Sequence, residues 1–251
     1  YEYYKKSNVV SQKTKSAMAY PTFVIAVAVI VLIIIMVKVI PTFTSMFKDF
    51  GAQLPLPTKI LIAITEWFQS WWLAFVGILA ALYVAFKIWT RSDKGKLQWS
   101  KLVLNMPTFG NVQRLNAAQQ FSTSMASLIG SGLSVAQSLA VTSKCLDSYA
   151  VSREVEAMSE KIETGAALSE VIKKSEYLPD VLKEMTGVGE RTGELEKTLA
   201  TVGTYYVQET DYATQKMLSK LEPTMLIIIA ILAGFIVISI YLPMFTMYNF
   251  M

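Results

Sequence analysis

Residues Gly187–Leu199 read GVGERTGELEKTL, so three closely spaced glycines precede a charged stretch. Such glycines raise the question of a phosphate-binding loop. A dinucleotide-binding loop has the spacing G-x-G-x-x-G after a strand, whereas here Thr192 stands where the third glycine belongs and Gly193 comes one residue late. The Gly-Lys-Ser/Thr of a P-loop is also missing from the segment. The glycines therefore do not predict a nucleotide site.

A tight turn between two helices accounts better for these residues. Carboxylates would repel a phosphate, but they are favourable near the first turn of a helix, where they interact with its dipole. Three of them follow the first glycines: Glu190, Glu194 and Glu196. We expect Gly187 and Gly189 to end one helix and Thr192 to cap the next. Gly193 is expected to adopt a backbone conformation that is costly for other residues.

The surrounding sequence, Lys101–Leu221, has a helical pattern throughout. One predicted helix has apolar residues every three or four positions, at Leu115, Ala118, Phe121, Met125, Leu128 and Ile129. Gly130–Gly132 is expected to end this helix, and Ser134 to cap the next one. Further helices are predicted over Ser148–Ile162 and Ala166–Ile172, from Pro179, and from Gly193 onward. No period-two alternation appears, so the sequence predicts an all-α bundle with short loops.

The composition indicates a membrane protein. Hydrophobic residues make up 53% of the 251 positions and charged residues 17%, which is more apolar than an ordinary soluble domain. The sequence has no histidine, the commonest general base and metal ligand. Its single cysteine, Cys145, makes neither an internal disulfide nor, alone, a zinc site. We expect no catalytic residue, no metal and no cofactor, and a protein that is not an enzyme.

Three long apolar segments predict transmembrane helices: Tyr20–Ile40, Trp71–Trp89 and Pro223–Leu242. Tryptophans lie at the ends of the second, as is typical of a membrane interface. We expect the chain to be divided into the end of a truncated first cytosolic domain (1–19), transmembrane helix 1 (20–47), an extracytoplasmic loop (48–70), transmembrane helix 2 (71–90), a second cytosolic helical bundle (101–221), transmembrane helix 3 (222–246) and an extracytoplasmic tail (247–251).

Lysine and arginine gather on one side of each predicted span. They precede the first span, follow the second and precede the third, at Lys5, Lys6, Lys13, Lys15, Lys87, Arg91, Lys94, Lys96, Lys101, Lys216 and Lys220. The two lysines between the first two spans are offset by two acidic residues. The positive-inside rule therefore predicts a cytosolic N-terminus, a cytosolic bundle, and an extracytoplasmic loop and C-terminus.

The first and third spans share residues at one constant offset, which indicates a duplicated unit. The correspondences are Tyr3-Tyr4 with Tyr205-Tyr206, Pro21-Thr22 with Pro223-Thr224, and Pro41-Thr42-Phe43-Thr44 with Pro243-Met244-Phe245-Thr246. A helical domain of ordinary size precedes the third span but not the first. We therefore expect a further helical domain before Tyr1 in the full-length protein.

Several motifs together resemble one protein family. Gly189–Leu195, GERTGEL, resembles the G-E-x-[ST]-G-x-L signature of the type II secretion F-protein and type IV pilus platform-protein family. Leu221–Pro223 and Tyr241–Phe245 resemble the family's closing motif around its last span. Gly51–Thr58 resembles its loop between the first two spans, and Tyr20-Pro21 matches the start of its first span. The resemblance covers essentially the whole chain, and it implies two homologous helical cytosolic domains and three spans.

The resemblance also implies a function. We expect a platform in the bacterial inner membrane that couples a cytosolic assembly ATPase to the insertion of pilin-like subunits into a filament. The implied partners are that hexameric ATPase, pilin or pseudopilin subunits, other inner-membrane assembly proteins, the lipid bilayer and further copies of the chain, with no nucleic acid. Contacts that the family builds between its two cytosolic domains, including acidic metal-binding contacts, do not carry over to a chain with one of them.

Five residues are our candidates for partner contacts: Glu190, Arg191, Gly193, Glu194 and Glu222. Reversing the charges of Glu190 and Arg191 is expected to shift stability by only about ±0.5 kcal/mol, as for exposed charges, yet to abolish filament assembly or ATPase recruitment. The alternative is that the turn only shapes the fold. Glu222, before the third span, is either an exposed interfacial residue or a receptor for a basic or amine group of a pilin.

Other classes of membrane protein compete with this interpretation. A small transporter would show charges or broken helices in mid-membrane, and no acidic residue lies within the predicted spans. A membrane-anchored lipid enzyme would need a nucleophile and base near the interface, and we find no such pair. A membrane-anchored scaffold unrelated to pili is a further alternative. The sequence does not distinguish among a retractable pilus, a secretion pseudopilus and a DNA-uptake pilus.

Overall fold

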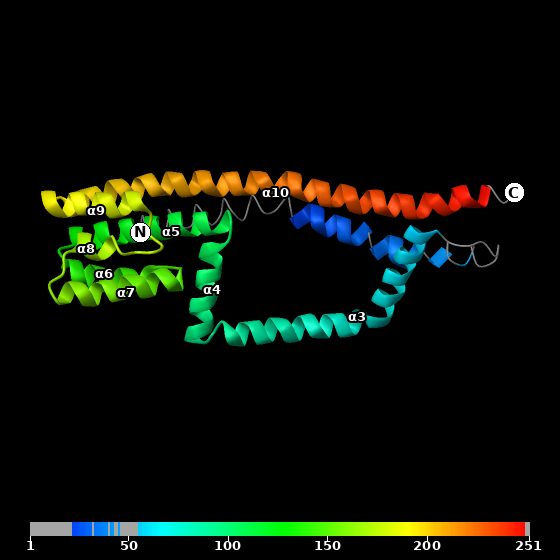
Figure 1. Cartoon of the computed structure of the whole chain (residues 1–251), viewed down its shortest axis with the longest axis horizontal. Coiled ribbons are helices and arrows are strands. Elements are labelled where there is room, and N and C mark those ends of the chain that lie inside the picture. The colour runs from blue at the N-terminus through cyan, green and yellow to red at the C-terminus, as the bar shows by residue number, and fades with distance from the viewer. Residues whose placement is uncertain (1–21, 32, 40, 43–44, 46–54, 249–251) are drawn as a thin grey trace. The chain divides into compact units, whose positions relative to one another are not determined.

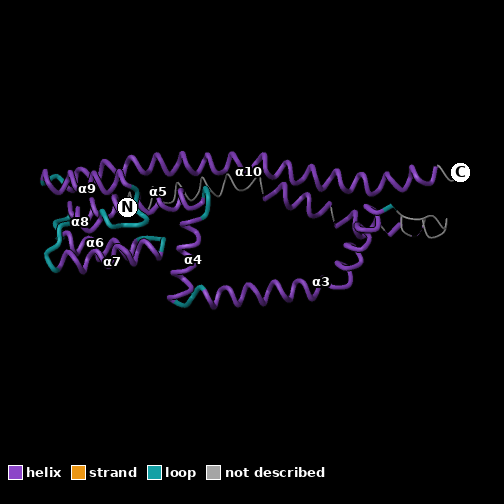
Figure 2. Tube along the Cα trace, viewed as in Figure 1, coloured by secondary structure: helices purple, strands orange, loops and turns teal. Residues whose placement is uncertain are grey.

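Every regular element in the described part of the chain is a helix, which confirms the all-α prediction. The computed structural model describes residues 22–31, 33–39, 41–42, 45 and 55–248. Figure 2 shows helices joined by short turns over this part of the chain. The chain divides into two compact units. The first contains Phe86–Met217, and the second contains the described parts of Ser11–Ala85 and Leu218–Met251.

The first unit is a helical bundle around one apolar core. Its helices are α4 (Asp93–Asn105), α5 (Phe109–Gly130), α6 (Val135–Cys145), α7 (Tyr149–Glu163), α8 (Leu168–Ile172), α9 (Asp180–Thr192) and the first part of α10 (Leu195–Tyr248) (Figure 1). The core includes the predicted face of α5, where Ala118, Phe121 and Met125 are fully buried. The 3.6-residue period of the apolar positions thus produced both the helix and its buried side.

The junction of α5 and α6 follows the sequence expectation closely. Helix α5 ends at Gly130, and Gly132 has a φ angle of 86°. Ser134 then caps α6 in a capping box with Gln137, because each side chain bonds the backbone N–H of the other, at 3.3 Å in both cases. The described bundle also contains a helix that the sequence reading did not separate: α4 begins at Asp93, before the Lys101 at which the bundle was expected to start.

The second unit corrects the expected loop before the second span. Helix α3 runs over Leu56–Trp89, so residues 56–70 are helical and not a loop. Its two arms, Leu56–Phe68 and Leu73–Trp89, differ in direction by 68°. The first arm packs on α10 inside this unit, where the Thr58 hydroxyl donates to the backbone oxygen of Ser239 at 2.7 Å. Both side chains are buried, so this hydrogen bond joins two apolar helices.

The structure supports fewer spans than the three predicted. One described helix segment, Leu195–Ser239, is long and apolar enough to cross a membrane, and the two arms of α3 make a second if they count as one span. The predicted first span lies partly outside the described residues. Its described part includes a short apolar helix over Thr22–Val31 and the π-helix η1 (Ile35–Val39). Three spans therefore remain a prediction.

Candidate partner-binding site

Four of the five candidate residues lie where α9 meets α10: Glu190 and Arg191 in the last turn of α9, and Gly193 and Glu194 between the two helices. Helix α9 continues to Thr192, so Gly187 and Gly189 lie inside this helix and do not end it as expected. The residue that ends it is Gly193, whose φ of 72° and ψ of 9° place it in the left-handed region. A glycine reaches this conformation without the steric cost that a Cβ would add, so the expectation for Gly193 is confirmed.

Thr192 does not cap α10, which corrects a second expectation. Its hydroxyl donates backwards to the backbone oxygen of Val188 at 3.0 Å, within the last turn of α9. Such a bond to the preceding turn is common for threonine within a helix. The residue before α10 is Glu194, whose backbone oxygen accepts from the N–H of Thr198 at 3.0 Å. The helix therefore begins two residues later than a Thr192 cap would require.

Gly189 allows α9 and α10 to approach each other closely. A Cβ added at this position would lie 3.0 Å from the Cβ of Thr198 and 3.1 Å from the Cα of Leu195. Leu195 also packs against the apolar core from the start of α10. The first glycine of the GERTGEL motif thus permits a helix contact, and the second permits the turn that produces it.

Glu190 holds the start of α8. Its two carboxylate oxygens accept from the backbone N–H groups of Leu168 and Ser169, at 2.7 and 2.9 Å. Burial raises the pKa of this carboxyl group, but hydrogen bonds from the side chain and backbone of Ser169 and from Leu168 outweigh that effect and leave the pKa lowered. We expected a freely exposed charge, and these bonds contradict that expectation. A partner contact of Glu190 stays a proposal, whereas its bonds within the chain are part of the fold.

The other candidates are more accessible or lie elsewhere. Arg191 and Glu194 are exposed, and Glu194 forms an exposed ion pair with Lys197 at 3.7 Å. Glu222 lies in α10, 28 residues after Glu194 and in the second unit, so the structure does not bring it together with the turn. Its side chain is outside the described part of the chain.

An exposed stripe on α9, next to the turn, was missed by the sequence reading. It consists of Val181, Glu184, Val188 and Arg191, spaced at three, seven and ten residues, and we call it the α9 stripe. Val181 and Val188 expose 49% and 38% of their surface, which is unusual for valines in a helix that packs on a core. The spacing was visible in the sequence, but a helix that ends at Gly187 or Gly189 does not include Arg191, so the full stripe was not recognised.

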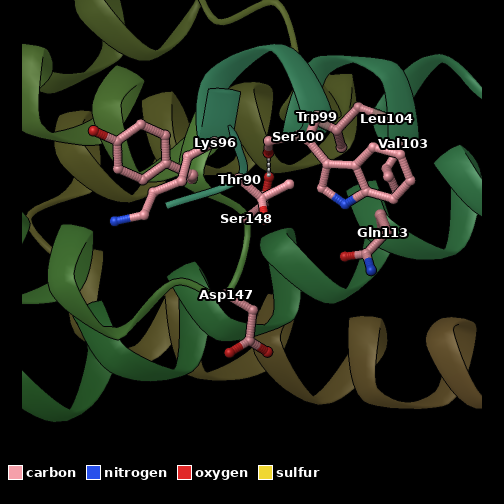
Figure 3. Close-up of a pocket in the computed structure, with 10 residues that line it drawn as sticks. Thr90, Lys96, Trp99, Ser100, Val103, Leu104, Gln113, Asp147 and Ser148 are labelled. Atoms are coloured by element: carbon pink, nitrogen blue, oxygen red, sulfur yellow. Dashed lines mark hydrogen bonds between the residues drawn. The ribbon is translucent and has the colours of Figure 1, made fainter. Parts of the chain in front are cut away.

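The described part of the bundle also contains a cavity of about 400 Å³ between α4, α5 and the turn before α7 (Figure 3). The hydroxyls of Ser100 and Ser148 bond each other at 3.0 Å, and Ser100 also accepts from the N–H of Ala150. Asp147 is paired with Gln120, whose amide donates to its carboxylate at 2.6 Å. Because these groups already bond one another, they offer little to a ligand. Among the described residues, no group of three or more acids or cysteines is arranged to hold a metal ion.

These features define a class of protein: the chain is helical, with a packed bundle and at least one helix long and apolar enough to cross a membrane. The family model for protein F of the type II secretion system matches residues 121–243. This range includes the α9–α10 turn and most of α10. The chain is thus similar to the type II secretion protein F family, as the motifs had indicated.

Characterised relatives match nearly the whole chain. The type IV pilus assembly protein PilC of Pseudomonas aeruginosa is 29% identical over 98% of this chain and 66% of its own length. PilC of Myxococcus xanthus is 31% identical over 98% of this chain and 59% of its own length. The type II secretion system protein F of Pseudomonas aeruginosa is 29% identical over 94% and 58%. The chain thus spans less than two thirds of each of these relatives.

Proposed function

We propose that this chain is part of an inner-membrane platform of a type IV pilus or type II secretion machine. The observation that carries the proposal is that pilus assembly proteins and a secretion F protein match it over 94–98% of its length. The platform would couple a hexameric cytosolic ATPase to the insertion of pilin or pseudopilin subunits. Other inner-membrane assembly proteins, the bilayer and further copies of the chain complete its surroundings, and it acts without catalysis of its own.

The proposed topology follows from charge and hydropathy. Three spans, a cytosolic N-terminus and an extracytoplasmic C-terminus agree with the distribution of lysine and arginine. Helix α10 supports a mechanical role, since it begins in the bundle at the GERTGEL turn and continues into the apolar segment without an interruption. A continuous helix is stiff over several turns, so a displacement of the bundle could be passed along it toward the membrane.

The α9 stripe is the proposed contact for the ATPase or another assembly component. Exposed valines alternate with charged residues along the stripe, and such a combination of apolar and charged side chains is typical of protein interfaces. Arg191 is the original candidate that belongs to this stripe, and Glu194 lies just beyond it. Glu190 is replaced as the main candidate because its carboxylate is bonded to α8.

A charge reversal on the stripe tests the proposal in the full-length protein. Glu184→Lys with Arg191→Glu should abolish filament assembly and co-purification of the ATPase, while membrane insertion and thermal unfolding stay near wild type. The matched control is Arg153→Glu with Glu156→Arg, which swaps an exposed ion pair on α7. The control should assemble filaments normally. Normal filaments from the stripe variant would show that this surface does not bind an essential partner.

The competing classes make different predictions. A small transporter should catalyse substrate flux in proteoliposomes, and a scaffold unrelated to pili should leave filament assembly intact when its gene is deleted. Loss of filaments on deletion, with restoration by the wild-type gene, would favour the platform over both. Whether the genomic neighbours encode pilins or pseudopilins would decide between pilus and secretion machines.

A further inference from the structure

Helix α4 lies directly after the end of α3 and is fixed there by packing. Only the turn Thr90–Ser92 separates the two helices. The ring of Trp99 packs edge-on against Phe86, in the last turns of α3, with ring centroids 4.9 Å apart. Both residues belong to the bundle unit, so the corner between the end of α3 and α4 is part of one compact structure (Figure 1).

The inner face of α4 is used by the bundle. Leu104 is buried, and Leu97 packs against the core. Ser100 bonds both the Ser148 hydroxyl and the N–H of Ala150, which ties α4 to the start of α7. These contacts determine which side of the helix is turned away from the bundle.

An exposed basic face lies beside this packed side. It consists of Lys94, Gln98, Lys101, Leu102 and Asn105, with Arg91 just before the helix, and we call these six residues the α4 face. At about 100° per residue they fall within an arc of about 100°. Within the described chain, Arg91, Lys94 and Lys101 form no ion pair and no side-chain hydrogen bond. The acidic residue nearest in sequence, Asp93, accepts a hydrogen bond from Tyr149.

We propose that the α4 face binds anionic phospholipid headgroups at the cytosolic surface of the membrane. A folded helix with several cations, immediately cytosolic to a transmembrane segment, is the arrangement that attracts acidic lipids. Trp89 and Trp99 lie at the same corner, and tryptophan favours the headgroup level. The charges of the face, at Arg91, Lys94 and Lys101, are all positive and so complementary to an acidic lipid surface, whereas the α9 stripe combines both signs with exposed valines.

This inference goes beyond the platform function but rests on the proposed membrane crossing of α3. Lipid contact at α4 would fix the bundle against the bilayer at the end of one span. Each cation near an acidic surface improves binding by about fivefold. Loss of Arg91, Lys94 and Lys101 together should therefore weaken the contact by about a hundredfold.

The test uses the whole chain in nanodiscs with a fluorophore on Gln98→Cys, in a Cys145→Ser background. We expect nitroxide-headgroup lipids to quench the label when about a third of the lipid is phosphatidylglycerol. Quenching should fall sharply in purely zwitterionic discs and in about 1 M salt, where charges are screened beyond about 3 Å. The triple variant Arg91→Gln, Lys94→Gln, Lys101→Gln should lose it as well.

The controls separate the possible causes. Neutralising three other exposed lysines, by Lys161→Gln, Lys173→Gln and Lys174→Gln, should leave the quenching unchanged. Equal quenching in zwitterionic discs, or in the variant that lacks the α4 cations, would overturn the inference. Loss of the quenching when free glycerol phosphate is added would also overturn it, because a competing free anion would indicate an ion site instead of a lipid surface.

A label on Ala80→Cys tests the span by itself. Quenching of this label by nitroxides on the acyl chains would establish that α3 is inserted, whatever happens at α4. If this label is not quenched, the proposed crossing of α3 is wrong and the lipid contact falls with it. The two failures can therefore be told apart in the same discs.

Discussion

Glu190 shows how one side chain can serve the fold at a position that looks like a binding site. Its carboxylate satisfies two backbone N–H groups at the start of α8, which have no partner inside that helix. Arg191, the next residue, lies about 100° further around the helix and is exposed. The two neighbours therefore differ in role, and a double charge reversal would disturb both a helix cap and a surface.

We predict that Glu190→Gln lowers the free energy of unfolding by about 1 kcal/mol, because an amide replaces one of the two accepting oxygens with a donor. In a chain of this size the melting temperature should fall by about 2–4 °C. Circular dichroism during thermal unfolding in detergent measures this change. Arg191→Gln is the neighbouring control and should stay within about 0.5 kcal/mol of wild type. Equal effects of the two substitutions would contradict the capping role.

The same cap predicts a pH dependence. Hydrogen bonds in the folded state lower the pKa of Glu190 below its ordinary value, so the carboxylate stabilises the fold above the unfolded pKa. This contribution is lost as pH falls through the folded pKa. The difference in melting temperature between wild type and Glu190→Gln should be constant at neutral pH and should shrink below about pH 4.5. A difference that grows in acid would refute the assigned hydrogen bonds.

At the scale of elements, the α9–α10 hairpin depends on how closely two helices approach. Gly187 and Gly189 lie two residues apart in α9 but meet different surroundings. A Cβ at Gly187 would have ordinary contacts at 3.5 Å, with Arg191 and Ser169 side chains. A Cβ at Gly189 would meet the backbone of α10 at 3.1 Å. Helix packing therefore requires a glycine at position 189 but not at position 187.

The two glycines give a matched pair of substitutions. Gly187→Ala should stabilise the protein by about 0.5–1 kcal/mol, since alanine favours a helix over glycine. Gly189→Ala gains the same helix propensity but forces α9 and α10 apart, so we expect it to be about 1–2 kcal/mol less stable than Gly187→Ala. Denaturant titration of both variants measures the difference. Equal stabilities would mean that the hairpin accommodates a methyl group without cost.

At the scale of the whole molecule, one helix belongs to both compact units. Helix α10 contributes to the bundle core through Leu199, Val202 and Tyr206, which are buried, and it ends in an apolar segment. The bundle segment and the apolar segment of one helix thus have different environments. The first packs on a protein core, and the second exposes side chains such as Ile227 and Ile231 that suit a lipid environment.

Cysteine accessibility tests the proposed topology. In a Cys145→Ser background, single cysteines at Gln53 and Asn249 should react with a membrane-impermeant thiol reagent in intact spheroplasts. A cysteine at Glu160, in α7, should react only after lysis, because the bundle is predicted to be cytosolic. Labelling at Glu160 before lysis would reverse the orientation.

Nucleotide binding separates a platform from an ATPase. We expect no binding or hydrolysis of ATP by the purified chain, since residues 187–192 are helical and no glycine loop precedes α10 to surround a phosphate. Isothermal titration calorimetry with Mg-ATP measures this directly. Stoichiometric binding with release of heat would require a nucleotide site that the described part of the chain does not show.

The sequence by itself determined what depends on local pattern. The period of apolar residues located α5, and Ser134 with Gln137 specified the start of α6, because both effects act within a few residues. Gly193 was identified for a similar reason, since its left-handed backbone is a local requirement. The motifs also identified the family, because each of them is a contiguous stretch of the chain.

Only the tertiary structure decided which residues of the turn are free. Glu190 bonds residues 21 and 22 positions away, and Gly189 faces the next helix across the turn. These partners depend on how α8, α9 and α10 pack, which no periodicity within one helix reveals. The same holds for Thr58 and Ser239, which are far apart in sequence and hydrogen-bonded in the fold. Local chemistry therefore fixed the helices and some of their ends, whereas packing fixed which side chains serve the fold and which are left for a partner.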